Sequence, residues 1–446
     1  MIRYVDYHLD AAAERMLTLC RFRPAATGPA LDTEPHAYAE WFAKELREVG
    51  FSASVRDMPG RPVAVGHDRR SLGPSVLFCG HYEVPPGSPR SGNRRDGTVP
   101  SSAADPRHRW TNDQSTQLLA FIEACRAWKA VAGQLPAPMS VLVEGEDRSD
   151  SAGLVPFMRM YADELKADIG LAPAAPTWRC SVPTIDSMLY GFCCEEFTIS
   201  IDADYPAEQG RGIAADPMLI LARILGDLHD ASGRVAIPGF YDGIDPSPGA
   251  PSDRRSSASG KAGDPPPAHD PAEPEGRREE KHVEAMPVWP TCEIDWVSSR
   301  HPAGGRQHEI YPPAFARLSL YLVWQQDPKL VCQAFRDFVR ARVPPSARIE
   351  FVSVASAVPV RFVANHPAFR KAQQALTVEW EREAVFACGN GSPGIHALVE
   401  ALGMEAIVTS FPEHQDASRI LRETVELASY RFRIRSWARI LDALGQ

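Results

Sequence analysis

The hydrophobic positions of this chain alternate between helical spacing and strand-like runs. Apolar residues recur every three or four positions in HAYAEWFAKELREVGF (36–51) and STQLLAFIEACRAWKAVAG (115–133), which predicts two amphipathic helices. The apolar runs PSVLFCGH (74–81) and MSVLVEGED (139–147) have the length of buried strands. Strand, helix and strand in this order predict an α/β fold, with a mainly parallel sheet sandwiched by helices.

The opening residues, MIRYVDYHLDAAAERML, carry charges throughout and lack an uninterrupted apolar core. They predict one amphipathic helix and not a signal peptide. No apolar stretch approaches the roughly 20 residues that cross a bilayer. We therefore expect no membrane partner and a cytoplasmic location.

A second group of elements interrupts this alternation. Four segments predict strands and two predict helices, which together indicate a small α+β module. The strand segments are FCCEEFTISIDAD, PTCEIDWVSS, FARLSLYLVW and ARIEFVSVAS, and the helix segments are DPMLILARILGDLHD and PKLVCQAFRDFVRARV.

The chain then returns to the first pattern and ends in the helical segment ELASYRFRIRSWARILDAL. These patterns predict a catalytic-type α/β domain in two parts, residues 1–192 and 359–446. An α+β lid or dimerisation domain, residues 193–358, is inserted between them. Within it, residues 247–284 are rich in Pro, Ser, Gly and charge, and predict a disordered insert.

Composition agrees with two domains and excludes one class of partner. The 446 residues are 44% hydrophobic, which is enough for two cores. The net charge of -9 comes without a basic stripe and argues against nucleic acid as a partner. Nine cysteines without a C-x-x-C pair fit reduced thiols. Cys193 and Cys194 are adjacent on a predicted strand, so their side chains should lie on opposite faces.

Two groups of polar residues follow predicted strands. His81 ends one apolar run, and Glu144 begins the acidic stretch after another. Ligands in open α/β sheets bind beyond the carboxyl ends of the strands, which makes these positions site candidates. A plainer interpretation stays open for each, because His81 could be a loop histidine and Asp113 could cap the helix that follows it.

Ordered motifs along nearly the whole chain resemble the co-catalytic zinc exopeptidases, and most closely the dipeptidase branch. This family includes carnosine dipeptidases, glutamate carboxypeptidase, aminoacylase and succinyl-diaminopimelate desuccinylase. The motifs that carry the resemblance are GHYEVPP, RDG, WTNDQST, EGEDRSDSAGL, IPGFYDGI and NGSPG. The resemblance implies the fold described above and a hydrolase that acts on peptide or other amide bonds.

The resemblance also implies a two-zinc site, yet several of its positions hold other residue types. His81 and Asp113 match metal-ligand positions, and Asp147 falls on the general-base position. Arg148 takes the place of the next ligand, and an arginine cannot bind a metal because it stays protonated. Ala174 and Ser418 fall on the two remaining ligand positions.

Two arrangements could follow from these replacements. In the first, Arg148 replaces the metal and pairs with the Asp113 carboxylate through bidentate hydrogen bonds. In the second, a single zinc ion is held by His81, Asp113 and one of Asp147, Glu83 or His414. We therefore predict no cofactor or one zinc ion, and not a two-zinc centre. Asp147 and Glu83 are the catalytic candidates.

The positions that the resemblance assigns to substrate binding are also altered. Tyr190 and Tyr321 fall where the family has arginines, and Tyr205 lies in the segment that replaces its lid histidine. Together with Arg148, these tyrosines are the substrate-binding candidates, although a tyrosine on a strand often serves packing alone.

Three functions remain possible. The first is a homologue that has lost two-zinc hydrolysis and binds a small amino-acid- or peptide-derived ligand, with the scaffold repurposed for a role such as a biosynthetic step. The second is a remodelled single-metal amide or peptide hydrolase. The third is a non-catalytic structural or regulatory subunit. The resemblance implies a homodimer through the lid domain.

Overall fold

The computed structural model describes residues 1–21, 34–59, 61–82, 109–111, 114–145, 153–174, 182–201, 216–244, 289–299, 312–412 and 424–446. Contacts divide the chain into two units, one of residues 1–187 and 362–446 and the other of residues 188–361. The predicted disordered insert, residues 247–284, lies outside the described residues. Within the described part of the chain, no helix has the length and apolarity needed to cross a membrane.

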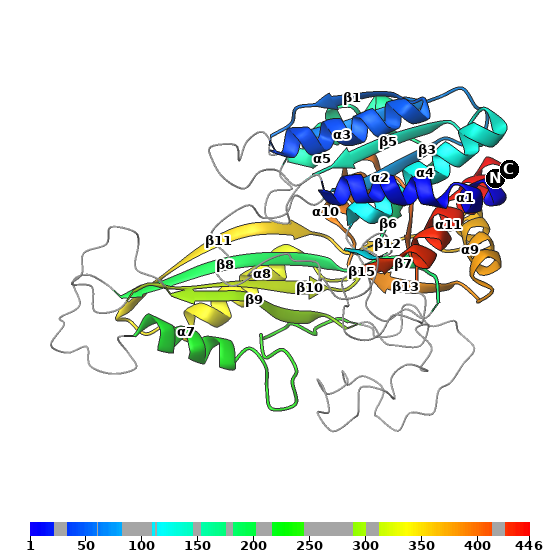
Figure 1. Cartoon of the computed structure of the whole chain (residues 1–446). Coiled ribbons are helices and arrows are strands. Elements are labelled where there is room, and N and C mark those ends of the chain that lie inside the picture. The colour runs from blue at the N-terminus through cyan, green and yellow to red at the C-terminus, as the bar shows by residue number, and fades with distance from the viewer. Residues whose placement is uncertain are drawn as a thin grey trace. The chain divides into compact units, whose positions relative to one another are not determined.

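The first unit is built on a sheet of nine described strands, of which β12 and the last two residues of β7 fall within residues 188–361, with helices on both faces of the sheet (Figure 1). Its order is β1-β2-β5-β3-β6-β14-β7-β12, and β13 pairs with β7. The strands are β1 (Ser52–Arg56), β2 (Val63–Asp68), β3 (Val76–His81), β5 (Met139–Glu144), β6 (Ile169–Pro173), β7 (Thr184–Leu189), β12 (Val360–Arg361), β13 (Val385–Gly389) and β14 (Ala406–Ser410).

Parallel pairing occupies the centre of this sheet. Strands β5, β3, β6 and β14 are mutually parallel neighbours, and β2, β1, β7 and β12 add antiparallel pairs on either side. Buried parallel strands read as continuous apolar runs, as β3 and β5 do. The predicted α/β class is confirmed, with the parallel strands gathered in the middle of the sheet.

Helices cover both faces of the sheet. The described helices of the first unit are α1 (Ile2–Tyr7), α2 (Leu9–Arg21), α3 (Glu34–Val49), α4 (Gln114–Ala132), α5 (Leu154–Met160), α6 (Ala162–Leu165), α9 (Pro367–Trp380), α10 (Pro393–Leu402) and α11 (Leu427–Gly445).

Alternate residues of β3 show which helices lie on each face. Phe78 stacks on Phe121 of α4 at a ring-centroid distance of 3.5 Å and meets Trp437 of α11 edge to face. Cys79 points the other way, because a Cβ placed on Gly394 of α10 would lie 3.2 Å from its Sγ. Period-two alternation therefore puts α4 and α11 on one face and α10 on the other.

The first helix differs from the prediction. One helix was expected over the opening residues, but α1 ends at Tyr7 and α2 begins at Leu9. His8 lies between them with φ -107° and ψ 17°, outside the helical region. The break leaves the His8 ring against that of Tyr4, with 4.0 Å between their centroids.

The second unit is an antiparallel sheet, β11-β8-β10-β9, with two helices on one face. Its elements are β8 (Gly191–Ile201), α7 (Pro217–Gly226), β9 (Thr291–Ser299), β10 (Ala314–Leu322), α8 (Pro328–Arg340) and β11 (Ala347–Ala357). Apolar residues of both helices pack with alternate residues of β8 and β10 in a single core. Cys193 belongs to this core, whereas Cys194 Sγ lies 3.8 Å from Asp295 Oδ2, so the predicted opposite orientation is confirmed.

A third, small pairing joins distant parts of the chain. Strand β4 (Arg109–Thr111) pairs with β15 (Thr424–Glu426), immediately before α11.

Candidate functional site

The central strands of the first unit end together at one edge of the sheet. Because β3, β5, β6 and β14 are parallel, their carboxyl ends lie side by side. The residues at these ends are His81, Glu144, Pro173 and Ser410. This edge is where open α/β sheets bind ligands.

His81 and Glu144 form a pair at this edge. They are directly opposite in the register of β3 and β5, and His81 Nδ1 lies 3.0 Å from Glu144 Oε1. The backbone N–H of Tyr82 also donates to the Glu144 carbonyl oxygen at 2.8 Å. The Glu144 side chain is 1% exposed and the His81 side chain 16%, so only the imidazole reaches solvent. Glu144 thus orients the ring through Nδ1.

Helix α10 also approaches the Glu144 carboxylate. A Cβ on Gly394 would lie 2.9 Å from Glu144 Oε1, so a larger residue here would have to displace the carboxylate. The helix is capped by Ser392, whose Oγ accepts a hydrogen bond from the Ile395 N–H at 3.3 Å. The N-terminal end of this helix therefore lies close to the buried carboxylate.

The one thiol beside this pair among the described residues is not an activated nucleophile. Burial, and then the charge of Glu144, raise the pKa of the Cys79 thiol. A nucleophilic cysteine requires the opposite shift, because the thiolate is the reactive form. The sequence has no G-x-S-x-G motif either, so covalent catalysis finds no support at this edge.

Tyr82 of GHYEVPP and Gly145 of EGEDRSDSAGL pack against each other. The fully buried Tyr82 donates its hydroxyl hydrogen to the Pro62 carbonyl oxygen at 2.8 Å and stacks on Tyr38 with ring centroids 6.0 Å apart. A Cβ on Gly145 would lie 2.0 Å from Tyr82 Cζ. The ring therefore occupies the space that any other residue at position 145 would need.

We predict that Gly145→Ala destabilises the protein by about 1–3 kcal/mol, because the added methyl overpacks the site and displaces the Tyr82 ring. Urea unfolding followed by tryptophan fluorescence measures the change. Gly226→Ala is the control, because a Cβ there meets nothing within 4 Å. Equal stability of the two variants would contradict the prediction.

Ala174 follows β6 at the same edge and lies at a ligand position that the resemblance implies. Its backbone N–H donates to the Thr409 carbonyl oxygen at 2.9 Å, and the residue is 3% exposed. A buried methyl group cannot bind a metal. Among the residues that the structure describes, no group of three or more His, Cys, Asp or Glu is placed to hold a metal ion. Ala174 therefore contributes no metal ligand to this edge.

Several predicted site residues lie outside the described residues. They are Glu83, Asp113, Asp147, Arg148, Tyr205, His414 and Ser418.

Tyr190 and Tyr321 lie together in the second unit. Their ring centroids are 6.3 Å apart with an interplanar angle of 74°, and both residues are half-buried. Tyr321 lies in β10 opposite Phe192 of β8. The two rings form an edge-to-face pair.

Asp186 is a buried acid that the sequence analysis missed. It lies in β7 at 3% exposure, and its Oδ2 has no hydrogen-bond partner among the described residues. Burial raises the pKa of this carboxyl to about 8. A Cβ on Gly389 would lie 2.0 Å from Asp186 Oδ2, so the β13 backbone covers the group. One acidic residue within a strand does not indicate whether its side chain is buried, so no sequence pattern indicated that Asp186 is covered.

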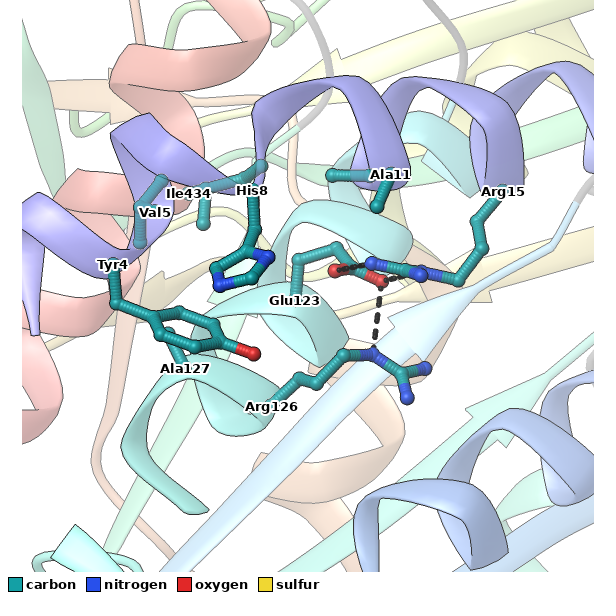
Figure 2. A pocket seen from close by; sticks show the side chains of 10 residues that line it. Tyr4, Val5, His8, Ala11, Arg15, Glu123, Arg126, Ala127 and Ile434 are labelled. Atoms are coloured by element: carbon teal, nitrogen blue, oxygen red, sulfur yellow. Dashed lines mark hydrogen bonds and ion pairs between the residues drawn. The ribbon is translucent and has the colours of Figure 1, made fainter. Parts of the chain in front are cut away.

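A separate cavity of about 120 Å³ lies among α1, α2, α4 and α11. Figure 2 shows Arg15 and Arg126 converging on Glu123, with Tyr4 and His8 beside them. Arg15 binds both Glu123 oxygens at 2.6 Å, and Arg126 Nε lies 3.3 Å from Glu123 Oε1. The charged groups satisfy one another, so we assign this cluster to anchoring α2 on α4.

No protein-family model matches the chain. Among curated proteins, it is 24% identical over 268 residues to a Beta-Ala-His dipeptidase of Rattus norvegicus, with 55% of this chain and 54% of the relative covered. It is also 24% identical over 229 residues to the Cys-Gly metallodipeptidase DUG1 of Candida albicans, covering 47% of each chain. The chain spans about half the length of the curated relatives it matches.

Several solved structures match over almost the whole chain, among them two that share its fold at TM-scores of about 0.7. One is human carnosine dipeptidase 1, with a TM-score of 0.73 and 17% identity over 100% of this chain and 98% of that one. The other is an M20 family metallo-carboxypeptidase from Sulfolobus solfataricus, with a TM-score of 0.69 and 22% identity over 99% of both chains. These matches establish the fold, and with the curated relatives they confirm the resemblance to the dipeptidase branch of the zinc exopeptidases.

Proposed function

We propose that this chain, a relative of the dipeptidase branch of the zinc exopeptidases, has lost two-zinc hydrolysis and binds a small amino-acid- or peptide-derived ligand at the strand-end edge. The observation that carries the proposal is Ala174, a buried methyl group at a position that the resemblance assigns to a zinc ligand. A co-catalytic centre requires nearly all of its ligands, and one empty position weakens it sharply.

The sequence adds a second argument. Arg148 follows Glu144 by four residues and falls on another position that the resemblance assigns to a zinc ligand, where a fixed positive charge would oppose a cation. A guanidinium and the His81 imidazole together offer donors to a ligand carboxylate. Asp113 and Asp147 offer acceptors to a ligand amino group. An amino acid derivative carries both groups.

Metal content tests the loss of the two-zinc centre. The full chain is purified from a zinc-supplemented culture without chelator, and its zinc is measured by elemental analysis. We expect well under one zinc ion per chain. Two zinc ions per chain would overturn the proposal, and one, with hydrolysis that chelation abolishes, would favour a single-metal hydrolase instead.

Thermal shift tests the ligand class. Dipeptides and N-acyl amino acids are added to the metal-free protein, and a ligand at about 100 times its Kd should stabilise it by about 2.7 kcal/mol. Arg148→Ala should abolish the shift. Arg340→Ala, which removes an arginine 49% exposed on α8, should preserve it. Binding that survives Arg148→Ala would contradict the proposed role of the guanidinium, and no shift with any member of either class would favour a structural subunit.

A further inference from the structure

Another cavity lies within the second unit, between α8 and β11. Its volume is about 230 Å³, below that of pockets for drug-sized molecules, which indicates a small ligand. Two of its lining side chains are cationic and none is acidic. The polar lining residues are Lys329, Cys332, Gln333 and Arg336 of α8, and Ser353 and Ser356 of β11.

Arg336 is fixed at the wall of this cavity. Its Nε donates to the Glu195 carboxylate at 2.8 Å and its Nη2 at 3.1 Å, and its guanidinium carbon lies 5.5 Å from the Phe351 ring centroid. The Glu195 side chain is 0% exposed and does not line the cavity. These contacts occupy two of the three guanidinium nitrogens, so Nη1 is left to donate to a ligand. Because the side chain is already ordered, binding an anion costs it little conformational freedom.

The charges around the cavity favour an anion. Glu195 balances Arg336, so the Lys329 ammonium is the remaining positive charge of the lining. The acids nearest in sequence do not line the cavity and are engaged elsewhere. Asp327 accepts the backbone N–H of Lys329 at 2.8 Å, and Asp337 pairs with an arginine one turn further along α8.

The lining also offers acceptors, which narrows the choice of anion. Gln333 donates from Nε2 to Asp337 at 2.9 Å, and the Ser353 hydroxyl donates to Glu195 at 2.5 Å. The Gln333 carbonyl oxygen and the Ser353 hydroxyl oxygen are therefore left as acceptors. An anion that also carries a proton can use both the donors and the acceptors. Inorganic phosphate keeps at least one proton at neutral pH, whereas sulfate and carboxylates keep none.

We propose that this cavity binds one hydrogen phosphate ion. Lys329, Arg336 and Ser356 donate to its oxygens. The side-chain oxygen of Gln333 or Ser353 accepts the hydrogen bond from its proton. The inference is independent of the proposed function at the strand-end edge, and it assigns a ligand site to the second unit.

Isothermal titration calorimetry of the full chain with inorganic phosphate tests the binding. The titrations are run at pH 7, with sodium chloride added to hold the ionic strength constant. We expect one phosphate per chain, and sulfate weaker by about fivefold, which is the scale of one net hydrogen bond. Glycerol 2-phosphate has a second pKa of about 6 and has mostly lost that proton at pH 7, so it should bind about as weakly as sulfate. An affinity for the ester or for sulfate that equals or exceeds the affinity for phosphate would overturn the assignment.

Two charge reversals locate the site. Lys329→Glu removes an attraction and adds a repulsion, so the phosphate affinity should fall about tenfold. Arg223→Glu makes the same change of charge at an exposed position of α7 and should keep the affinity of the parent. Circular dichroism and urea unfolding show whether each variant folds.

A second pair of variants tests the β11 side of the cavity. Ser356→Asp places a carboxylate in the lining and should abolish measurable phosphate binding. Ser356→Asn, which is similar in size and uncharged, should retain it. Both variants keep the ion pair of Arg336 with Glu195, whereas replacing Arg336 would leave Glu195 buried and unpaired.

Three further results would overturn the inference. They are the absence of phosphate binding to the parent, an affinity that survives both Lys329→Glu and Ser356→Asp, and the loss of phosphate binding in Arg148→Ala, which would place the ion at the strand-end edge instead.

Discussion

Zinc affinity should rise at least about a hundredfold in the triple variant Arg148→Glu, Ala174→Asp and Ser418→His, because each substitution restores an oxygen or nitrogen ligand at a position that the resemblance implies. Loss of an outer-shell partner alone typically changes metal affinity by 10–100-fold, and ligands in direct contact contribute more. Arg148→Glu also removes a fixed cation from the site.

Competition with a chromophoric chelator measures this affinity. The matched control is Arg148→Gln, Ala174→Asn and Ser418→Gln, which changes the same positions without adding a charged carboxylate or an imidazole. Zinc should raise the unfolding temperature of the triple variant and leave the control near the parent. If the triple variant and the control bind zinc equally, the assignment of the three ligand positions is wrong.

We expect the parent protein to lose stability as the pH rises from about 5 to 8. Asp186→Asn should abolish most of this loss. The folded-state pKa of Asp186 is raised to about 8 from an ordinary value of 3.8. The folded protein therefore holds a proton that the unfolded chain releases. The stabilisation is fully present below pH 3.8 and is lost as the pH approaches 8.

The expected effect is large because each pKa unit corresponds to about 1.4 kcal/mol. Between pH 5 and pH 8 the stability of Asp186→Asn relative to the parent should improve by about 2–4 kcal/mol. Urea unfolding at both pH values gives this difference, and any constant penalty of the buried amide cancels.

Asp168→Asn is the control, because the pKa of Asp168 is shifted in the opposite direction and its effect on stability should depend on pH with the opposite sign. Hydrogen bonds from the Ser75 backbone N–H and hydroxyl lower the pKa of Asp168, so its charged form is stabilising. The stability it contributes is present above its ordinary pKa and is lost on acidification. A pH dependence for Asp186→Asn that matches the parent would show that Asp186 ionises normally in the folded protein.

The sequence predicted the helices and strands correctly where the spacing of apolar residues was regular. The run at 74–81 contains β3, and the helical spacing at 115–133 coincides with α4 to within a residue at each end. Such segments bury one face or a whole strand, so their apolar positions report their geometry. The break at His8 was missed because the amphipathic spacing continues across it. The antiparallel flanks of the large sheet were missed because pairing direction has no local signal.

The site was readable only in part. The end of an apolar run located His81 and Glu144, but not their pairing, because strand register depends on tertiary contacts. The approach of Gly394 to Glu144 joins positions 250 residues apart, which no local pattern encodes. Ala174 was identified as a missing ligand through the resemblance alone.

The second unit leaves and rejoins the first at neighbouring points of the chain. The Phe362 N–H donates to the Ser187 carbonyl oxygen at 2.9 Å, and Val360 and Arg361 pair with Leu189 and Met188. Residues 188–361 are therefore connected to the rest of the chain at two adjacent positions. If these residues were deleted, a short turn could join residues 187 and 362, so the whole module could be exchanged between relatives at this junction.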